Sequence, residues 1–84
     1  MEFTYKTKGV CSVSINIDVD GDTVKSVKYL GGCHGNLQGI CALVEGMKVD
    51  AVIERLENIR CGFKNTSCPA QLADALKKYK AENL

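Results

Sequence analysis

The chain has 84 residues, of which 45% are hydrophobic and 25% are charged, and its formal net charge is +1. This length gives one domain with one core, and the near-neutral charge argues against nucleic acid or anionic lipid as a partner. No apolar run approaches the roughly 18 residues that span a membrane. The alternating residues after Met1 are not typical of a signal peptide, so we expect a cytoplasmic protein.

The first part of the chain predicts three antiparallel strands. Residues 2–6 form one strand, with Phe3 and Tyr5 on the same side. Residues 11–20 alternate with a period of two, which is typical of a half-buried strand. On the inner side we expect Cys11, Val13, Ile15, Ile17 and Val19, and on the outer side Ser12, Ser14, Asn16, Asp18 and Asp20. A turn signal at 20–22 makes residues 23–30 the returning strand of a hairpin.

The apolar spacing then becomes helical, which predicts three helices. Asn36 is the expected N-cap of the first helix and Gly46 its stop. The apolar face of the second helix is expected to consist of Val49, Val52, Ile53, Leu56 and Ile59. Pro69 falls in the first turn of the third helix, which should bury Leu72, Ala73, Leu76 and Tyr79. We therefore predict a single α+β domain over residues 1–84, in which three helices pack on one face of a three-stranded sheet.

The sequence contains 5 cysteines. In a reducing cytoplasm, such residues are more often metal ligands or redox groups than disulfides. Cys41 lies in the apolar stripe of the first helix, so we interpret it as a small core residue. The others lie at predicted element boundaries, where a rigid scaffold presents side chains to one rim. We expect a common metal-binding site formed by Cys11, Cys33, Cys61 and Cys68.

The surroundings of these cysteines suggest how such a site would work. Gly31, Gly32 and Gly35 flank Cys33 and permit unusual backbone angles and a close approach of the backbone. Cys33 and Cys68 precede helices, whose N-terminal dipoles favour thiolates. His34 is a candidate auxiliary ligand or proton carrier, although a solvent-exposed loop histidine is the more ordinary interpretation.

Two motifs carry a family resemblance. Residues 31–36 are Gly-Gly-Cys-His-Gly-Asn, and residues 66–72 are Thr-Ser-Cys-Pro-Ala-Gln-Leu. The chain resembles, over nearly its whole length, the standalone four-cysteine branch of the TSCPD domain family. A domain of this type ends many adenosylcobalamin-dependent ribonucleotide reductases, where a metal-binding role has been proposed. The resemblance implies the same four cysteines as ligands. Ala70 stands where the naming motif has Asp, so a carboxylate there cannot be essential.

Three functions follow as hypotheses. The first is a module whose four thiolates hold Zn²⁺ or an iron–sulfur cluster, and the layout is similar to that of iron–sulfur scaffold proteins. The second is a thiol–disulfide redox protein that uses Cys61 and Cys68. The third, implied by the family, is a regulatory domain that binds ribonucleotide reductase or another protein.

The sequence does not suggest an enzyme. No acid–base pair or Ser/His/Asp arrangement is visible, and a reductase activity would belong to the fused relatives rather than to a chain of this length. The exposed edge of the predicted hairpin would allow a homodimer.

Overall fold

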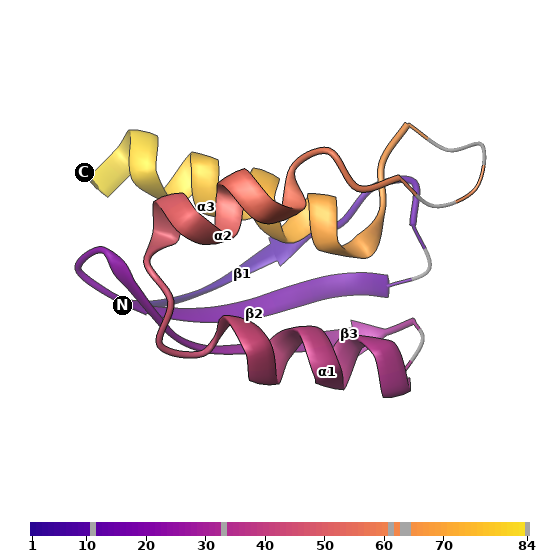
Figure 1. Ribbon diagram of the computed structural model, residues 1–84, viewed down its shortest axis with the longest axis horizontal. Helices are drawn as coiled ribbons and strands as arrows, with labels where there is room; N and C mark the ends of the chain where they lie inside the picture. Colours follow the sequence, from indigo (N-terminus) through magenta and orange to yellow (C-terminus); the bar gives the residue numbers. More distant parts are fainter. Residues whose placement is uncertain (11, 33, 61, 63–64, 84) are drawn as a thin grey trace.

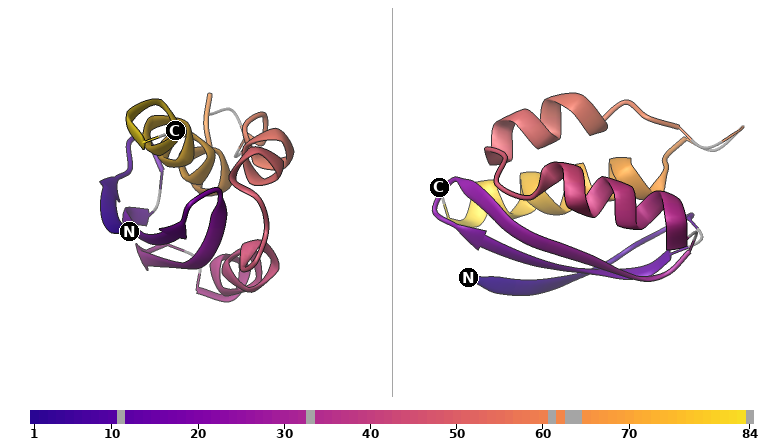
Figure 2. Two further views of the ribbon diagram at one scale, coloured as in Figure 1. Left: turned by 90° about the vertical axis from the view of Figure 1, so that its left-hand side faces the viewer. Right: turned by 60° about the horizontal axis from the view of Figure 1, so that its bottom comes forward.

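The structure is a computed structural model that describes residues 1–10, 12–32, 34–60, 62 and 65–83. Strands precede helices along the chain, and the helices cover one face of the sheet (Figures 1 and 2). In chain order, the elements are β1 (Glu2–Lys6), β2 (Ser12–Asp20), β3 (Thr23–Gly31), α1 (His34–Val44), α2 (Val49–Leu56) and α3 (Cys68–Asn83). The predicted α+β class and the order of the elements are therefore confirmed.

The sheet is antiparallel throughout, with the strand order β1-β2-β3. Thr4 of β1 lies opposite Asn16 of β2, which in turn lies opposite Lys28 of β3. The tight turn between β2 and β3 uses Gly21 in the left-handed region, with φ of 62°, a conformation that glycine adopts without a steric penalty. The strands are thus joined into one short meander, which needs helices only on its apolar face.

The predicted alternation of β2 is wrong at the start of the strand. Ile15, Ile17 and Val19 are buried as expected, but Ser12 is only 4% exposed, whereas Val13 is 61% exposed. The register of β2 against β3 shifts between Ser12 and Ser14. A bulge of this kind adds one residue to a strand and reverses which side chains face the core. The polar Ser12, and not Val13, therefore points inward.

The helix boundaries differ from the prediction at two places. α1 begins at His34, before the predicted cap Asn36, because left-handed glycines turn the chain directly from β3 into the helix. It ends at Val44, and Gly46 with φ of 86° follows as the predicted stop. α2 ends at Leu56 and does not extend to Ile59, which is 41% exposed.

The core lies between the sheet and the helices. The residues predicted to face inward from the third helix (Leu72, Ala73, Leu76 and Tyr79) are all buried. The Tyr79 ring stacks on that of Phe3 with a centroid distance of 5.7 Å. Cys41 is half-buried and packs against the core, as predicted. No helix in the described part of the chain is long and apolar enough to cross a membrane.

Candidate functional site

Cys68 is the first residue of α3, and its position is fixed by a hydrogen-bonded cap. The preceding residue, Ser67, accepts the N–H of Ala70 on its Oγ at 3.1 Å, which is the usual N-cap arrangement. The same hydroxyl donates to the carbonyl of Ile59 at 2.6 Å. The cap therefore also ties the start of α3 to the segment that follows α2.

Cys68 also joins the helix to the sheet. Its Sγ lies 3.2 Å from Oγ of Ser12 at the start of β2, and its carbonyl accepts a 2.9 Å hydrogen bond from the hydroxyl of Tyr29 in β3. Burial raises the pKa of Tyr29 far above its ordinary value, and negative charge on Cys41 and Cys68 acts in the same direction. Tyr29 is therefore a neutral hydrogen-bond donor, and Cys68 is anchored to two strands.

Gln71 connects the loop before β2 to the start of α3. Its Oε1 accepts the backbone N–H of Lys8 at 3.0 Å, and its Nε2 donates to Oγ1 of Thr66 at 3.0 Å. In the same loop, the Thr7 hydroxyl donates to the carbonyl of Ser12 at 2.5 Å. Gln71 is only 5% exposed, and sequence reasoning missed its role. The signal available in the sequence was that the polar Gln71 directly precedes Leu72 and Ala73, which the pattern predicts to face inward from the third helix.

Gly32 lies tightly packed where β3 turns into α1. Its φ is 85°, and a Cβ added there would lie 2.8 Å from Cδ1 of Leu37 and 3.3 Å from the backbone N of Ser12. Gly31 is also left-handed, with φ of 77°. Gly35 lies inside α1, and a Cβ there would meet no described atom within 4 Å. Close approach is thus a property of Gly32, which brings the end of β3 against the start of β2.

Among the predicted ligands, Cys68 lies in the described part of the chain, whereas Cys11, Cys33, Cys61 and the His34 side chain lie outside it. Within the described residues, no group of three or more His, Cys, Asp and Glu could hold a metal ion. The convergence of the four thiols therefore stays a prediction.

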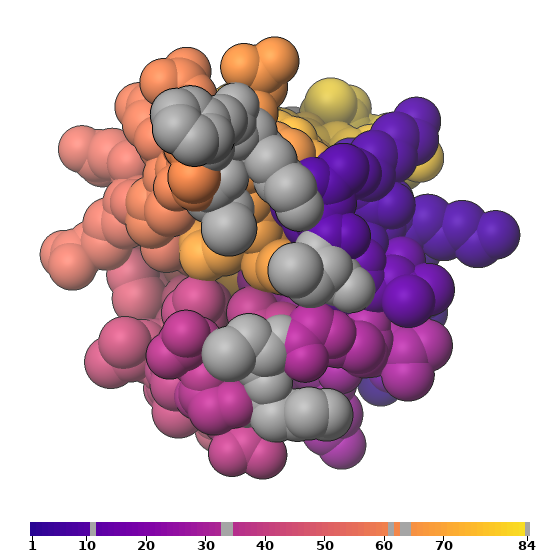
Figure 3. Space-filling view, turned by 90° about the vertical axis from the view of Figure 1, so that its right-hand side faces the viewer, coloured from indigo at the N-terminus to yellow at the C-terminus, as the bar shows by residue number. Residues whose placement is uncertain are grey.

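The described chain next to each of the other cysteines can still be located. Ser12 contacts Cys68, Gly32 packs against Ser12, and Ile59 is bonded to Ser67. The starts of β2, α1 and α3 lie at the same end of the molecule, and Figure 3 shows this end face-on. The described residues Ser12, Gly32 and Ile59, which lie within two positions of the other predicted ligands, are therefore brought close to the start of α3.

Comparison with protein families finds that the TSCPD domain matches residues 3–80 of this chain. The chain belongs to the TSCPD domain family. No curated protein and no solved structure matches it. The departure from the TSCPD motif, Ala70, is 4% exposed and lies in the first turn of α3. In this TSCPD domain, a methyl group fills the buried position, and the Ser67 hydroxyl caps the helix without a carboxylate beside it.

The fifth cysteine of this TSCPD domain, Cys41, has surroundings of its own. It lines a groove of about 370 Å³ between β3 and α1, together with Val27, Tyr29 and Leu37. Burial raises the pKa of the Cys41 thiol, and hydrogen bonding to the backbone of Tyr29 offsets part of this effect. A thiol with a raised pKa is a poor nucleophile and a poor ligand near neutral pH. These properties fit the predicted role of Cys41 as a packing residue.

Proposed function

We propose that this TSCPD domain is a small metal-binding module in which Cys11, Cys33, Cys61 and Cys68 hold a zinc ion or an iron–sulfur cluster. Thiolates in a set of four are the usual protein ligands of both. The observation that carries the proposal is the meeting of the flanking segments at one end of the fold, with Ser12 Oγ 3.2 Å from Cys68 Sγ.

The described residues fit such a group. Cys68 lies at the N-terminus of a 16-residue helix, whose dipole stabilises a thiolate. The Ser12 hydroxyl can donate to the Cys68 sulfur, and such outer hydrogen bonds orient metal ligands and tune their basicity. Gly32 lets the chain before Cys33 pass close to β2. A bound metal would supply a cross-link between segments far apart in sequence, and its binding energy would add to the stability of a small core.

Elemental analysis of untagged protein purified without oxygen tests this function. We expect about one zinc ion per chain, or iron with acid-labile sulfide and visible absorption. Cys68→Ser should lose the metal, because it removes one ligand. Cys41→Ser is the matched control, since it removes a thiol on the same fold but outside the proposed set, and it should keep the metal.

Two results would contradict the proposal. One is wild-type protein without metal in which Cys11, Cys33, Cys61 and Cys68 all react with a thiol reagent under native conditions. The other is a Cys41→Ser variant that loses as much metal as Cys68→Ser. If the protein does bind metal, the visible spectrum and the content of acid-labile sulfide distinguish a zinc ion from an iron–sulfur cluster, because Zn²⁺ has no visible absorption.

We further propose, on the basis of family membership alone, that the module is accessory to a ribonucleotide reductase. A domain of this size has no space for the radical chemistry of such an enzyme, so the contribution of the domain over residues 3–80 would be binding or regulation. The test is to add the purified, metal-loaded domain to the reductase of the same organism. Binding or a change in reductase activity supports the proposal, and the absence of both rejects it.

A further inference from the structure

The two edges of the sheet differ in how they are covered. At the edge of β3, the backbone of Val24 donates to the carbonyl of Met47 and accepts from Gly46, both at 2.8 Å, so part of this edge is already paired. At the edge of β1, no described residue pairs with the backbone on the side away from β2. β1 is therefore the open edge of the sheet, and open edges are templates for pairing with another strand.

The hydrogen bonds of β2 show which groups of β1 point outward. Val19 donates to Met1 at 2.8 Å, and Thr7 donates to Val13 at 3.2 Å. Because residues of an antiparallel pair alternate in direction, residues 1, 3, 5 and 7 direct their N–H and C=O toward β2. The N–H and C=O groups of Glu2, Thr4 and Lys6 therefore face outward.

The sequence of β1, Glu-Phe-Thr-Tyr-Lys, is complementary to itself in antiparallel order. If two copies pair about a two-fold axis at Thr4, each Glu2 lies directly opposite Lys6 of the other copy. Both side chains are exposed and lack an ion-pair partner among the described residues. We propose that β1 is a homodimer interface in which two copies join their sheets edge to edge through this register.

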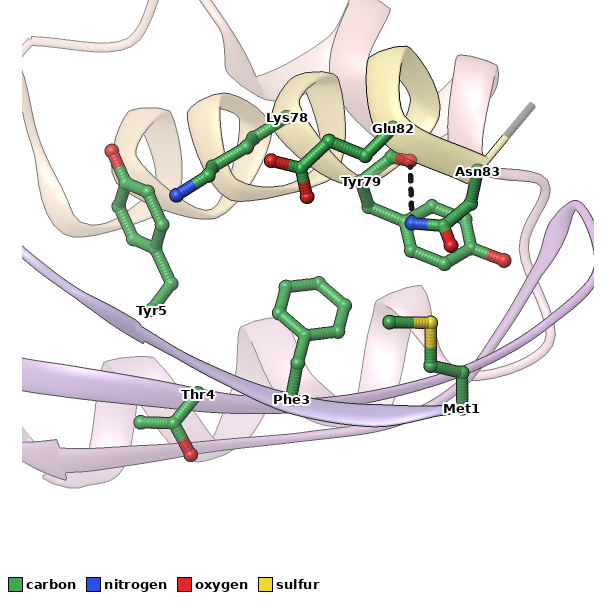
Figure 4. Close-up of a pocket in the computed structure, with 8 residues that line it drawn as sticks. All are labelled: Met1, Phe3, Thr4, Tyr5, Lys78, Tyr79, Glu82 and Asn83. Atoms are coloured by element: carbon green, nitrogen blue, oxygen red, sulfur yellow. Dashed lines mark hydrogen bonds between the residues drawn. The ribbon is translucent and has the colours of Figure 1, made fainter.

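The helix side of the same edge offers a matching surface. Phe3 and Tyr5 reach from β1 toward α3, whereas Thr4 points to the opposite side (Figure 4). A groove of about 180 Å³ runs between them and α3, and the side chains of Lys78 and Glu82 line it from the helix. In the proposed register, Phe3 lies opposite Tyr5 of the second copy, and aromatic pairs directly opposite each other stabilise the pairing of antiparallel strands.

The proposed pairing of two β1 strands is two-fold symmetric, so the assembly ends at two copies. Three residue pairs around the axis exchange both backbone hydrogen bonds, and the same patch serves both copies, as in an isologous dimer. The contact is limited to one five-residue strand and the adjoining groove, so the interface falls at the small end of the usual size range, below about 1,200 Å². We expect a reversible dimer with a concentration-dependent mass.

Charge-swap variants test the register, with sedimentation velocity under reducing conditions as the measurement. Glu2→Lys places Lys opposite Lys, and Lys6→Glu places Glu opposite Glu. Each variant alone should self-associate at least about tenfold more weakly, because two attractive pairs become repulsive. An equimolar mixture of the two variants should recover the dimer, since every pair then joins opposite charges. The double variant should recover it as well.

Thr4→Pro tests the backbone pairing. It removes an outward N–H at the axis, which an edge strand tolerates without loss of the fold, and it should give a monomer whose thermal midpoint changes little. Lys28→Glu, on the same sheet face but on β3, is the matched control and should dimerise like the wild type. A wild type that stays monomeric at several hundred micromolar, or a dimer that survives Thr4→Pro, overturns the proposal. The proposal is also overturned if the equimolar mixture of Glu2→Lys and Lys6→Glu does not recover the dimer.

Discussion

The side-chain oxygen of Ser12 lies 3.2 Å from the sulfur of Cys68, although 56 positions separate the two residues along the chain. Ser12 is buried by a β-bulge that turns its side chain inward, and Cys68 is placed by the cap of α3. The contact therefore depends on two separate features, the register of β2 against β3 and the cap of α3. It joins the start of β2 to the start of α3 at the end of the molecule where the metal site is proposed.

Ser12→Ala should weaken metal retention without removing a ligand. The loss of the hydroxyl takes away the hydrogen bond to the Cys68 sulfur, and the loss of outer hydrogen bonds typically costs about 10–100-fold in metal affinity. Competition with a chromogenic chelator measures the effect. Ser14→Ala, a less buried serine on the same strand, is the control. Equal affinities for the two variants would show that the Ser12 hydroxyl does not act on the metal site.

Gln71→Leu should destabilise the fold by about 1–3 kcal/mol, because the N–H of Lys8 and the hydroxyl of Thr66 lose their partner. Urea unfolding followed by circular dichroism gives the free energy. Gln38→Leu is the matched control, since Gln38 is exposed on α1, and it should stay within about 0.5 kcal/mol of wild type. If Gln71→Leu were as stable as this control, the two hydrogen bonds would contribute nothing to the fold.

Gly32→Ala should cost about 2–4 kcal/mol, because a Cβ meets Leu37 at 2.8 Å and the φ of 85° is strained for alanine. Gly39→Ala should have the opposite effect on the free energy of unfolding. Gly39 lies inside α1 with open space around it, so alanine there should stabilise by about 0.5–1 kcal/mol. Thermal and urea unfolding measure both variants. The interpretation fails if both substitutions change the stability in the same direction.

Cys41 should react slowly with iodoacetamide near neutral pH. Burial raises its pKa above the ordinary value of 9.0, and only the thiolate is nucleophilic. The rate should therefore increase with pH, with a midpoint above that of an unperturbed cysteine thiol. Mass spectrometry of the modified peptide follows the reaction, and Cys41→Ala identifies the signal. A midpoint below that value would mean that the thiol is more accessible to solvent than the structure indicates.

Periodicity alone determined the class and the order of the elements. The alternation of Ile15, Ile17 and Val19 and the helical spacing of Leu72, Leu76 and Tyr79 are local patterns, and the structure buries all of these residues. Left-handed glycines such as Gly46 also mark the ends of elements locally. These predictions succeed because burial on one face is recorded in neighbouring residues.

Only the tertiary structure decided the details of the proposed site. The bulge that buries Ser12 depends on the register of β2 against β3. The backbone N–H that Gln71 accepts belongs to Lys8, 63 positions away, and the hydrogen bond between Ser67 and Ile59 depends on how the segment after α2 lies against α3. A sequence pattern records the period of an element but not its register or its neighbours. The position of Cys68 at the start of α3 could therefore be predicted from the sequence, whereas the contacts that join this position to the start of β2 and to the segment after α2 could not.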